Sequence, residues 1–253
     1  MVTPELRSAV TSLVREAGRA TMAYYDTGVS AGVREKDDRS PVTLADEVAH
    51  EILVGGLERL DPGTPVVSEE AEAASFDRRQ SWRRFWLVDP LDGTKEFIKR
   101  RAEFTVNAAL IEDGEPVLGV VLAPALDLLY WAVKGEGAWK EERGGAPERI
   151  YSRSAAPGTP LTVVESLSHP SDELEEYLKT IPVARRVKAG SSLKFCWVAE
   201  GRADVYPRLG PTMEWDVAAG DCVYRQSGPD GERQSPLTYN KPDLRNTSFV
   251  IGL

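Results

Sequence analysis

The spacing of apolar residues near the start of the chain predicts two amphipathic helices. Over residues 4–27, apolar side chains recur at steps of three and four, which is the period of one helix face. These side chains are Leu6, Val10, Leu13, Val14 and Ala17. A second helix is predicted over residues 44–60, with Thr43 as its N-cap, and the polar residues 28–41 are predicted to form a loop.

Short apolar runs that end in turn residues predict the strands of the first half. Single strands are expected over residues 66–70 and 84–90, with a helical or irregular polar segment between them. Two hairpins are expected next, over residues 104–124 and 127–142, because each has two β-rich runs around a glycine-containing turn. The first half is therefore predicted to be rich in hairpins.

Strands and helices alternate in the second half. Strands are expected over residues 160–166, 184–190, 203–209 and 246–252, and helices over residues 171–181, 191–202 and 214–228. This alternation after a hairpin-rich first half predicts an α/β fold of stacked layers in two lobes. The stretch from Arg143 to Pro160 is rich in Gly, Ala, Pro and Ser, and we place the boundary there, between a lobe of residues 1–150 and a lobe of residues 151–253.

The composition is that of a globular protein. Of 253 residues, 42% are apolar and 28% are charged, and the chain is long enough to bury a large core. The sequence has no apolar run of 18 residues, and its N-terminus lacks the features of a secretory signal, so we expect no membrane-spanning helix. Only two cysteines occur, Cys196 and Cys222, and neither lies in a CxxC motif, which favours a reducing cytoplasm.

The chain is acidic. Its net charge of −9 argues against general affinity for nucleic acid. If the substrate is an anion, an acidic chain has to attract it locally, and bound cations would do so.

Four carboxylates stand out by their positions. They are Glu69, Asp89, Asp92 and Asp216, with Asp46 as a fifth candidate. Glu69 follows the apolar run PVVS and Asp89 follows WLV, and strand ends are where ligand sites of α/β folds form. Asp92 lies three residues beyond Asp89 across a Pro-Leu turn, so both carboxylates and the Leu91 carbonyl can face one point.

This set of residues has the parts of a phosphate ester hydrolase. Oxygen ligands without His or Cys suit Mg²⁺, Mn²⁺ or Ca²⁺ rather than Zn²⁺, and without a cation the acids would repel one another. Gly93 permits a tight backbone, and the amides of Gly93, Thr94 and Lys95 can open a helix and bind a phosphate. The Thr94 hydroxyl can hold a water molecule that Asp46, if near, orients, as metal-assisted hydrolysis requires.

Each feature taken alone also has a structural explanation. Asp-Gly-Thr is a common turn, and Asp216, near the start of a helix, suits a cap or an interaction with the helix dipole. His169 in isolation suits a surface loop, and the two cysteines suit core positions. Only the ordered set of motifs points to one chemistry.

Five stretches together carry a family resemblance. In order they are SPVTLADEVAHEIL, VVSEE, WLVDPLDGTKEF, FTVNAALIEDGEPVLGVV and EWDVAAGDCV, and the match runs from about Val42 to Val223. The set resembles the inositol monophosphatase superfamily of Mg²⁺-dependent, Li⁺-sensitive phosphatases. The resemblance implies a layered αβαβα sandwich, as in inositol monophosphatase and fructose-1,6-bisphosphatase. Lys95-Glu96-Phe97 and the run GSSLK are typical of the 3′(2′),5′-bisphosphate nucleotidase branch.

The resemblance implies a set of metal ligands. They are Glu69, Asp89, the Leu91 carbonyl, Asp92 and Asp216, most of them in the N-terminal lobe. The first three would hold one Mg²⁺, and the three aspartates would hold a second. A third, looser ion would lie near Glu69 and, through water, near Asp46. Mn²⁺ is expected to be able to replace Mg²⁺, and Li⁺ to inhibit.

The resemblance also implies roles in catalysis and substrate binding. Thr94 with Asp46 would position the attacking water. The residues implied to meet the substrate are Gly93, Thr94, His169, Ser191, Ser192 and Lys194. Of these, the Gly93 and Thr94 amides would bind the labile phosphate, and Lys194 would bind the phosphate that is not cleaved.

The activity implied is Mg²⁺-dependent hydrolysis of the 3′-phosphate of 3′-phosphoadenosine 5′-phosphate to AMP and phosphate, in support of sulfate assimilation. Two alternatives stay open: an inositol monophosphatase or broad sugar-phosphate phosphatase of the same superfamily, and a non-catalytic nucleotide or metal sensor. The expected partner is a small phosphorylated substrate, and a homodimer would be in keeping with the superfamily. Residues 143–155 match no motif of the family.

Overall fold

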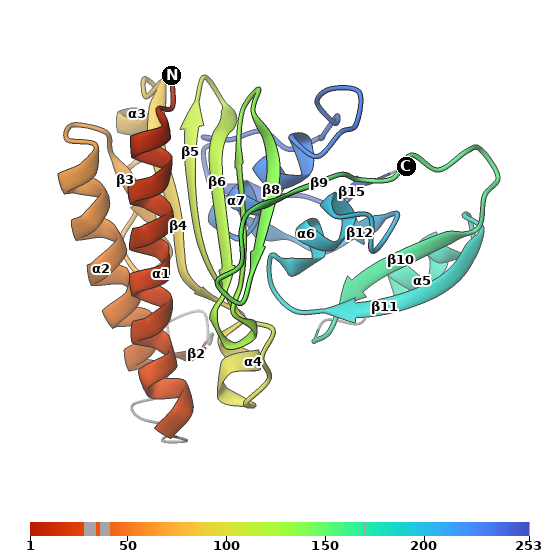
Figure 1. Cartoon of the computed structure of the whole chain (residues 1–253), viewed down its shortest axis with the longest axis horizontal. Coiled ribbons are helices and arrows are strands. Elements are labelled where there is room, and N and C mark those ends of the chain that lie inside the picture. The colour runs from red at the N-terminus through yellow and green to blue at the C-terminus, as the bar shows by residue number, and fades with distance from the viewer. Residues whose placement is uncertain (28–33, 36–40, 169–170, 253) are drawn as a thin grey trace.

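The computed structural model describes residues 1–27, 34–35, 41–168 and 171–252. The two N-terminal helices have the bounds that the apolar spacing predicted: α1 spans Pro4–Thr27 and α2 spans Leu44–Leu60. Val10, Val14 and Ala17 of α1 are buried, as expected of its apolar face. The two helices lie side by side on one face of the main sheet (Figure 1).

The predicted loop between these helices lies mostly outside the described residues. Two short strands are described in this region: β1 (Arg34–Glu35) lies within the predicted loop, and β2 (Pro41–Val42) lies at its end. The two strands pair antiparallel. Strands of two residues have no apolar period, so they could not be predicted from the sequence.

Among the described residues, the largest sheet has seven strands in chain order, β3 to β9. Their bounds are β3 Val66–Ser68, β4 Arg84–Asp92, β5 Thr105–Glu112, β6 Glu115–Ala123, β7 Leu128–Val133, β8 Gly137–Glu142 and β9 Glu148–Ile150. β3 and β4 are parallel and the later neighbours are antiparallel, which confirms both predicted hairpins. β9 was not predicted, because its three residues lie in the polar stretch where only a lobe boundary was expected.

Short helices lie in the connections of this sheet. α3 (Phe76–Arg79) lies in the segment between β3 and β4 that was expected to be helical or irregular. α4 (Thr94–Ile98) follows β4 directly, and the 3₁₀ helix η1 (Pro124–Leu126) joins β6 to β7. α4 begins where the DGT turn was expected to open a helix.

The second half forms smaller sheets and three helices among its described residues. Their bounds are β10 Leu161–Ser166, α5 Asp172–Leu178, β11 Val183–Ala189, α6 Leu193–Ala199, β12 Tyr206–Arg208, β13 Thr212–Met213, α7 Glu214–Arg225, β14 Arg245–Asn246 and β15 Phe249–Ile251. β10 and β11 pair parallel, whereas β12 pairs with β15 and β13 with β14 antiparallel. The two-residue strands β13 and β14 were not predicted.

The elements stack in five layers, as Figure 1 shows: α1 with α2, the main sheet, α6 with α7, the sheet of β10 and β11, and α5. β4 illustrates the division of the core. Trp86 and Val88 pack toward α1 and α2, whereas Phe85 and Leu87 pack on the side of α6 and α7. The layered αβαβα sandwich predicted from the sequence is therefore confirmed.

The predicted lobe boundary at residue 150 coincides with the end of β9. α7 lies beyond this boundary but packs on β6 of the main sheet, so the core of the first sheet includes residues from both sides. The division into two lobes stays a prediction. None of the helices in the described parts of the chain is long and apolar enough to cross a membrane.

The contact between β6 and α7 predicts an unequal response to two glycine substitutions. A Cβ added at Gly119 would lie 2.5 Å from the Ala219 carbonyl oxygen, so we expect Gly119→Ala to destabilise the fold by about 1–3 kcal/mol. A Cβ at Gly55 of α2 would meet only the end of the Arg59 side chain at 3.4 Å, and Gly55→Ala should raise stability by up to about 1 kcal/mol. Urea unfolding of both variants checks the opposite signs, and equal effects would contradict this packing.

Candidate active site

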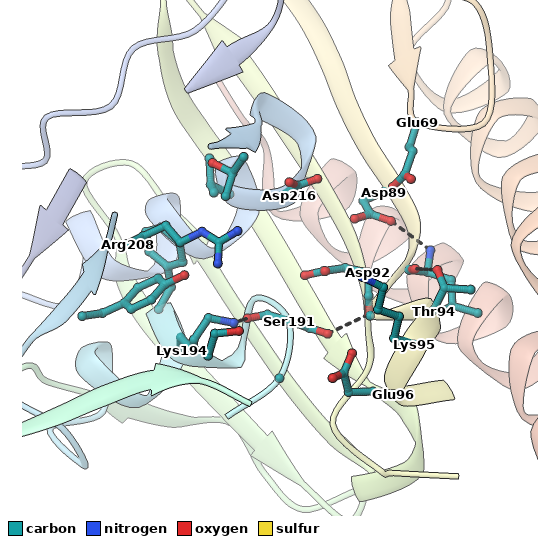
Figure 2. A pocket seen from close by; sticks show the side chains of 18 residues that line it. Glu69, Asp89, Asp92, Thr94, Lys95, Glu96, Ser191, Lys194, Arg208 and Asp216 are labelled. Carbon is teal, nitrogen blue, oxygen red and sulfur yellow. Dashed lines mark hydrogen bonds between the residues drawn. The ribbon is translucent and has the colours of Figure 1, made fainter. Parts of the chain in front are cut away.

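A cavity of about 290 Å³ opens at the end of β4, between the main sheet and α6 and α7. Side chains from widely separated parts of the sequence line it (Figure 2). They include Glu69, Asp89, Asp92, Thr94, Lys95, Glu96, Ser191, Lys194, Tyr206, Arg208 and Asp216. Most of the predicted site residues are therefore brought together in one place.

An irregularity in β4 turns two aspartates to the same face. In a regular strand, residues three apart point to opposite faces. Between Asp89 and Asp92, however, the pairing with β5 shifts: Asp89 lies opposite Asn107 and Asp92 opposite Thr105. One extra residue of β4 is accommodated as a bulge, and both carboxylates face the cavity as a result.

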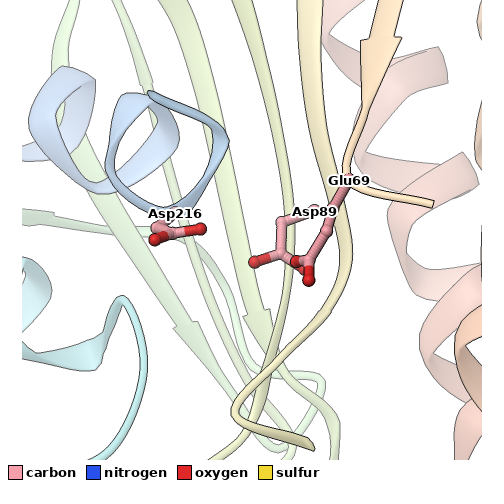
Figure 3. A group of neighbouring side chains, drawn as sticks. All are labelled: Glu69, Asp89 and Asp216. Carbon is pink, nitrogen blue, oxygen red and sulfur yellow. The ribbon is translucent and has the colours of Figure 1, made fainter. Parts of the chain in front are cut away.

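Glu69 and Asp216 approach Asp89 from two other elements. Glu69 directly follows β3, and its backbone amide donates to the Val88 carbonyl at 3.1 Å. Asp216 is the third residue of α7. Single carboxylate oxygens of Glu69, Asp89 and Asp216 all lie within 4.8 Å of one another (Figure 3).

The position of Asp216 is compatible with both roles considered for it, as a helix cap and as a ligand. Its Oδ2 accepts a hydrogen bond from the backbone amide of Met213 at 2.8 Å, which caps α7. Asp89 is held in the same way, because its Oδ1 accepts from the Leu91 amide at 3.1 Å. In each case one carboxylate oxygen fixes the side chain and the other can face a ligand.

Asp46 lies behind Thr94 rather than in the wall of the cavity. Its Oδ2 accepts from the backbone amide and hydroxyl of Thr43 at 2.8 and 2.6 Å, so the predicted N-cap of α2 is confirmed. Its Oδ1 lies 3.4 Å from the Thr94 hydroxyl, which also lies 3.3 Å from the Leu91 carbonyl. Because this hydroxyl has two acceptors beside it, its own lone pairs can accept a hydrogen bond from a water in the cavity.

The acids of the cavity are under strong mutual repulsion. Burial, followed by the charges of neighbouring acids, raises the pKa of Asp89 and of Asp216 well above the usual value. Burial also raises the pKa of Asp92 to about 6, although Lys194 opposes the shift. Such a group of oxygen ligands fits Mg²⁺ or Mn²⁺, which would remove the repulsion.

The phosphate turn, Gly93 to Lys95, has the backbone geometry expected of it. Gly93 has a φ of 91°, which favours glycine, and it is the N-cap of α4. A Cβ at this position would also overlap the Ser191 hydroxyl. The first turn of a helix leaves amide groups without an intrahelical acceptor, so these amides can bind an anion.

The two serines of GSSLK connect α6 to the acid-bearing segments. The Ser191 hydroxyl donates to the Asp92 carbonyl at 2.7 Å and lies 3.0 Å from the Glu103 carbonyl. The Ser192 hydroxyl donates to the Asp216 carbonyl at 2.7 Å and accepts from the side-chain amide of Asn107 at 3.1 Å. Ser192 is only 2% exposed and does not line the cavity, so its position favours a structural role over the predicted contact with substrate.

Lys194 brings a positive charge into the cavity. Its Nζ donates to the Ser191 carbonyl at 2.6 Å, and the side chain is buried. Burial lowers the pKa of this ammonium to about 8, and the charge of Asp92 opposes the shift. His169, the remaining predicted substrate contact, lies outside the described residues.

Sequence reasoning missed Tyr206 and Arg208, which β12 carries into the cavity. The Arg208 guanidinium donates through Nη2 to the Pro211 carbonyl at 3.1 Å, and its buried Nε has no partner among the described residues. The available signal was an arginine near the end of a predicted strand. That signal is weak, because only the pairing of β12 with β15 brings the strand to this place.

Sequence and structure comparisons define the class. The model of the inositol monophosphatase family matches residues 3–248, and the chain belongs to this family. The family resemblance predicted from the five motifs is therefore confirmed.

Individual relatives cover nearly the whole chain. The 3′(2′),5′-bisphosphate nucleotidase CysQ of Escherichia coli strain K12 is 52% identical over 247 residues, 96% of this chain and 98% of that protein. CysQ of Haemophilus influenzae is 34% identical over 250 residues, 97% of this chain and 92% of that protein. The crystal structure of CysQ from Bacteroides thetaiotaomicron has a TM-score of 0.81 and 38% identity, and the match covers 97% of this chain and 96% of that one.

The raised pKa of Asp92 predicts that Asp92→Asn stabilises the metal-free protein, whereas it should weaken the stabilisation that Mg²⁺ gives. In the metal-free protein the folded state binds this proton more tightly than the unfolded state, so stability falls as the pH rises through about 6. Asp92→Asn should therefore raise the unfolding temperature by roughly 2–4 °C at about pH 8, and hardly change it at about pH 4.

With Mg²⁺ present, the same substitution should reduce the stabilisation that the metal gives, because it removes a charged ligand. Calorimetric scans in EDTA and in Mg²⁺ check both signs. An equal shift at both pH values without metal would show that the ionisation of buried Asp92 is not the cause.

Proposed function

We propose that this chain is a Mg²⁺-dependent phosphatase that hydrolyses the 3′-phosphate of 3′-phosphoadenosine 5′-phosphate to AMP and phosphate. One observation carries the proposal: a single cavity has a carboxylate cluster for metal ions and, apart from it, the cations Lys194 and Arg208. A substrate with one phosphate to cleave and a second to retain matches this pair of charges. CysQ relatives, similar over nearly the whole chain, bear the name of that activity.

The chain offers ligands for two to three metal ions. Glu69, Asp89 and the Leu91 carbonyl would hold one Mg²⁺, and Asp89, Asp92 and Asp216 a second. A third would lie near Glu69. Bound Mg²⁺ would neutralise these acids and the substrate phosphate, and make water a better nucleophile. Mn²⁺ would substitute and Li⁺ would inhibit, as the family resemblance implies.

Thr94 and Asp46 position the attacking water. Asp46 keeps its place because both of its oxygens are engaged, one by the cap of α2 and one by the Thr94 hydroxyl. The Thr94 hydroxyl therefore points its proton away from the cavity and presents lone pairs to the water. The amides of Gly93 and Thr94 bind the reacting phosphate from the start of α4.

The remainder of the substrate extends away from the acids. Lys194 and Arg208 bind the retained phosphate by charge-assisted hydrogen bonds. A second cavity of about 350 Å³ shares Ser166, Tyr206 and Arg208 with the first and has room for a nucleoside. A non-catalytic sensor is less consistent with the site, because the metal-binding acids and the Thr94–Asp46 pair are all present.

We infer a cytoplasmic location from the thiols. Cys196 and Cys222 are both buried and free, which suits a reducing compartment. A homodimer also remains a proposal, taken from the superfamily.

A substrate panel tests the proposed function. Phosphate release with Mg²⁺ should be at least about tenfold more efficient, as kcat/KM, for 3′-phosphoadenosine 5′-phosphate than for inositol 1-phosphate, because only the first has a second phosphate for the cations. EDTA should abolish the release and millimolar Li⁺ should reduce it. Asp89→Asn serves as the control against a contaminating phosphatase. A preference for inositol 1-phosphate would overturn the nucleotidase assignment.

Lys194→Ala tests the site of the retained phosphate. We expect its KM for the bisphosphate to rise roughly 10- to 100-fold with little change in kcat, since a charge-assisted hydrogen bond to a non-reacting group is lost. The control is Lys188→Ala, which removes a half-exposed lysine of β11. An unchanged KM would refute the role of Lys194.

The pH dependence gives an independent check on Lys194. Because burial lowers its pKa to about 8, kcat/KM for the bisphosphate should fall as the pH rises beyond that value. The fall should be absent from Lys194→Ala. If the variant keeps the same profile, another group is responsible.

A further inference from the structure

Glu96 is a buried carboxylate of the cavity that the metal site does not use. It is the third residue of α4 and is 5% exposed. Figure 2 shows it apart from Asp216 and Glu69, on the side of the cavity where Ser191 lies. Its carboxylate accepts a hydrogen bond from the Ser168 hydroxyl, just beyond the end of β10.

The usual structural role for a glutamate at this position is absent. At the third residue of a helix, a glutamate can accept from the backbone amide of the N-cap. The N-cap of α4 is Gly93, and no side-chain cap bond is present there. Glu96 is instead directed across the cavity wall to a different layer of the fold. A buried carboxylate is costly unless it is hydrogen-bonded, so the bond from Ser168 helps to stabilise this one.

Three segments meet at Glu96. A Cβ added at Gly93 would overlap the Ser191 hydroxyl and lie 3.4 Å from Glu96 Oε2, so both groups flank the phosphate turn. The turn is thus contacted by the start of α6 through Ser191 and by the end of β10 through Glu96 and Ser168. Among the residues that the structure describes, no other side-chain hydrogen bond joins α4 to residues 167–168, which follow β10.

Glu96 also lies between the acid cluster and the buried cation. Burial is the main cause of the raised pKa of Asp92 and of the lowered pKa of Lys194, and the charge of Glu96 adds to the first and opposes the second. Glu96 is therefore close enough to both groups to influence them. In the proposed function, Glu96 lies between the site of the reacting phosphate and the site of the rest of the substrate.

The strand end that Glu96 holds is part of both cavities. Ser166, two residues before Ser168, lines the cavity of the acids and the adjoining cavity. A shift of this strand end would change the wall around the distal part of the substrate. The metal-binding acids, which β3, β4 and α7 position, would be unaffected.

We propose that Glu96 is a positioning residue for the distal part of the substrate, acting through its hydrogen bond to Ser168, which fixes the end of β10 against the phosphate turn. The inference rests on the proposed function, because it concerns the group beyond the reacting phosphate. It assigns a role to the glutamate of the Lys-Glu-Phe sequence after the DGT turn.

Four variants separate this role from a charge effect. Glu96→Ala removes the acceptor, Ser168→Ala removes the donor, and the double variant removes both. Glu96→Gln removes the charge but keeps an oxygen that accepts from the Ser168 hydroxyl. Glu173→Ala, at an exposed acid of α5, is the control for a general change of charge.

We expect Glu96→Ala and Ser168→Ala each to raise the KM for the bisphosphate roughly 3- to 10-fold, with kcat nearly unchanged. The double variant should be no worse than Glu96→Ala, and Glu96→Gln should stay within about twofold of the wild type. The KM for 3′-AMP, which lacks the second phosphate, should change less. An unaffected Ser168→Ala, or a Glu96→Gln as impaired as Glu96→Ala, would overturn the proposal.

A cycle of unfolding free energies, measured without substrate on the same variants, tests the hydrogen bond itself. Additive effects of Glu96→Ala and Ser168→Ala would show that the two side chains do not interact, and would overturn the proposal. If the wild type fails to hydrolyse the bisphosphate while the cycle shows coupling, the proposed function fails and the bond stands.

Discussion

Repulsion among buried carboxylates is the constraint on which this structure depends. Asp89 is almost completely buried, and Asp92 and Asp216 are close enough to raise its pKa. Without a cation these acids oppose the compact state. The fold has to hold them together against that repulsion, and they are carried by the buried strand β4, by the end of the strand beside it and by the first turn of α7.

Hydrogen bonds from backbone amides help to hold these carboxylates in place. Asp89, Asp216 and Asp46 each use an oxygen to accept from a backbone amide two or three residues away. This leaves the other oxygen of Asp89 and of Asp216 for a ligand in the cavity, whereas that of Asp46 lies beside the Thr94 hydroxyl. A carboxylate that caps a helix therefore keeps an oxygen that a ligand can use, and a cap in the sequence is no argument against a ligand.

The sequence predicted those parts of the fold that have a period or a turn signal. α1, α2 and both hairpins follow apolar spacing, and their bounds agree closely with the prediction. The short strands β9, β13 and β14 have too few residues for a period, and they form because longer elements bring their partners near. The local sequence pattern carries no information about which distant segments the fold brings together.

The same limit applies to the candidate site. The acids could be predicted because each lies at the end of an apolar run or beside a helix start. The positions of Ser192 and Arg208 could not be predicted, because tertiary contacts decide them. The Ser192 hydroxyl points to the Asp216 carbonyl and not into the cavity. The Arg208 guanidinium reaches the cavity only because β12 pairs with β15. Sequence motifs thus predicted the carboxylate cluster better than the rest of the cavity wall.

The distance between the two charged parts of the cavity follows from these tertiary contacts. The acids belong to the main sheet and α7, whereas Lys194 belongs to α6. Ser191 and Ser192 hydrogen-bond the start of α6 to the backbone of Asp92 and Asp216, and these bonds tie the position of the ammonium to that of the two acids. A chain with a net charge of −9 gains little from long-range attraction of an anion, so recognition must depend on short-range contacts. Under the proposed function, a fixed separation between the carboxylate cluster and the cation would favour a ligand whose two phosphates have that same separation, and no basic surface would be needed.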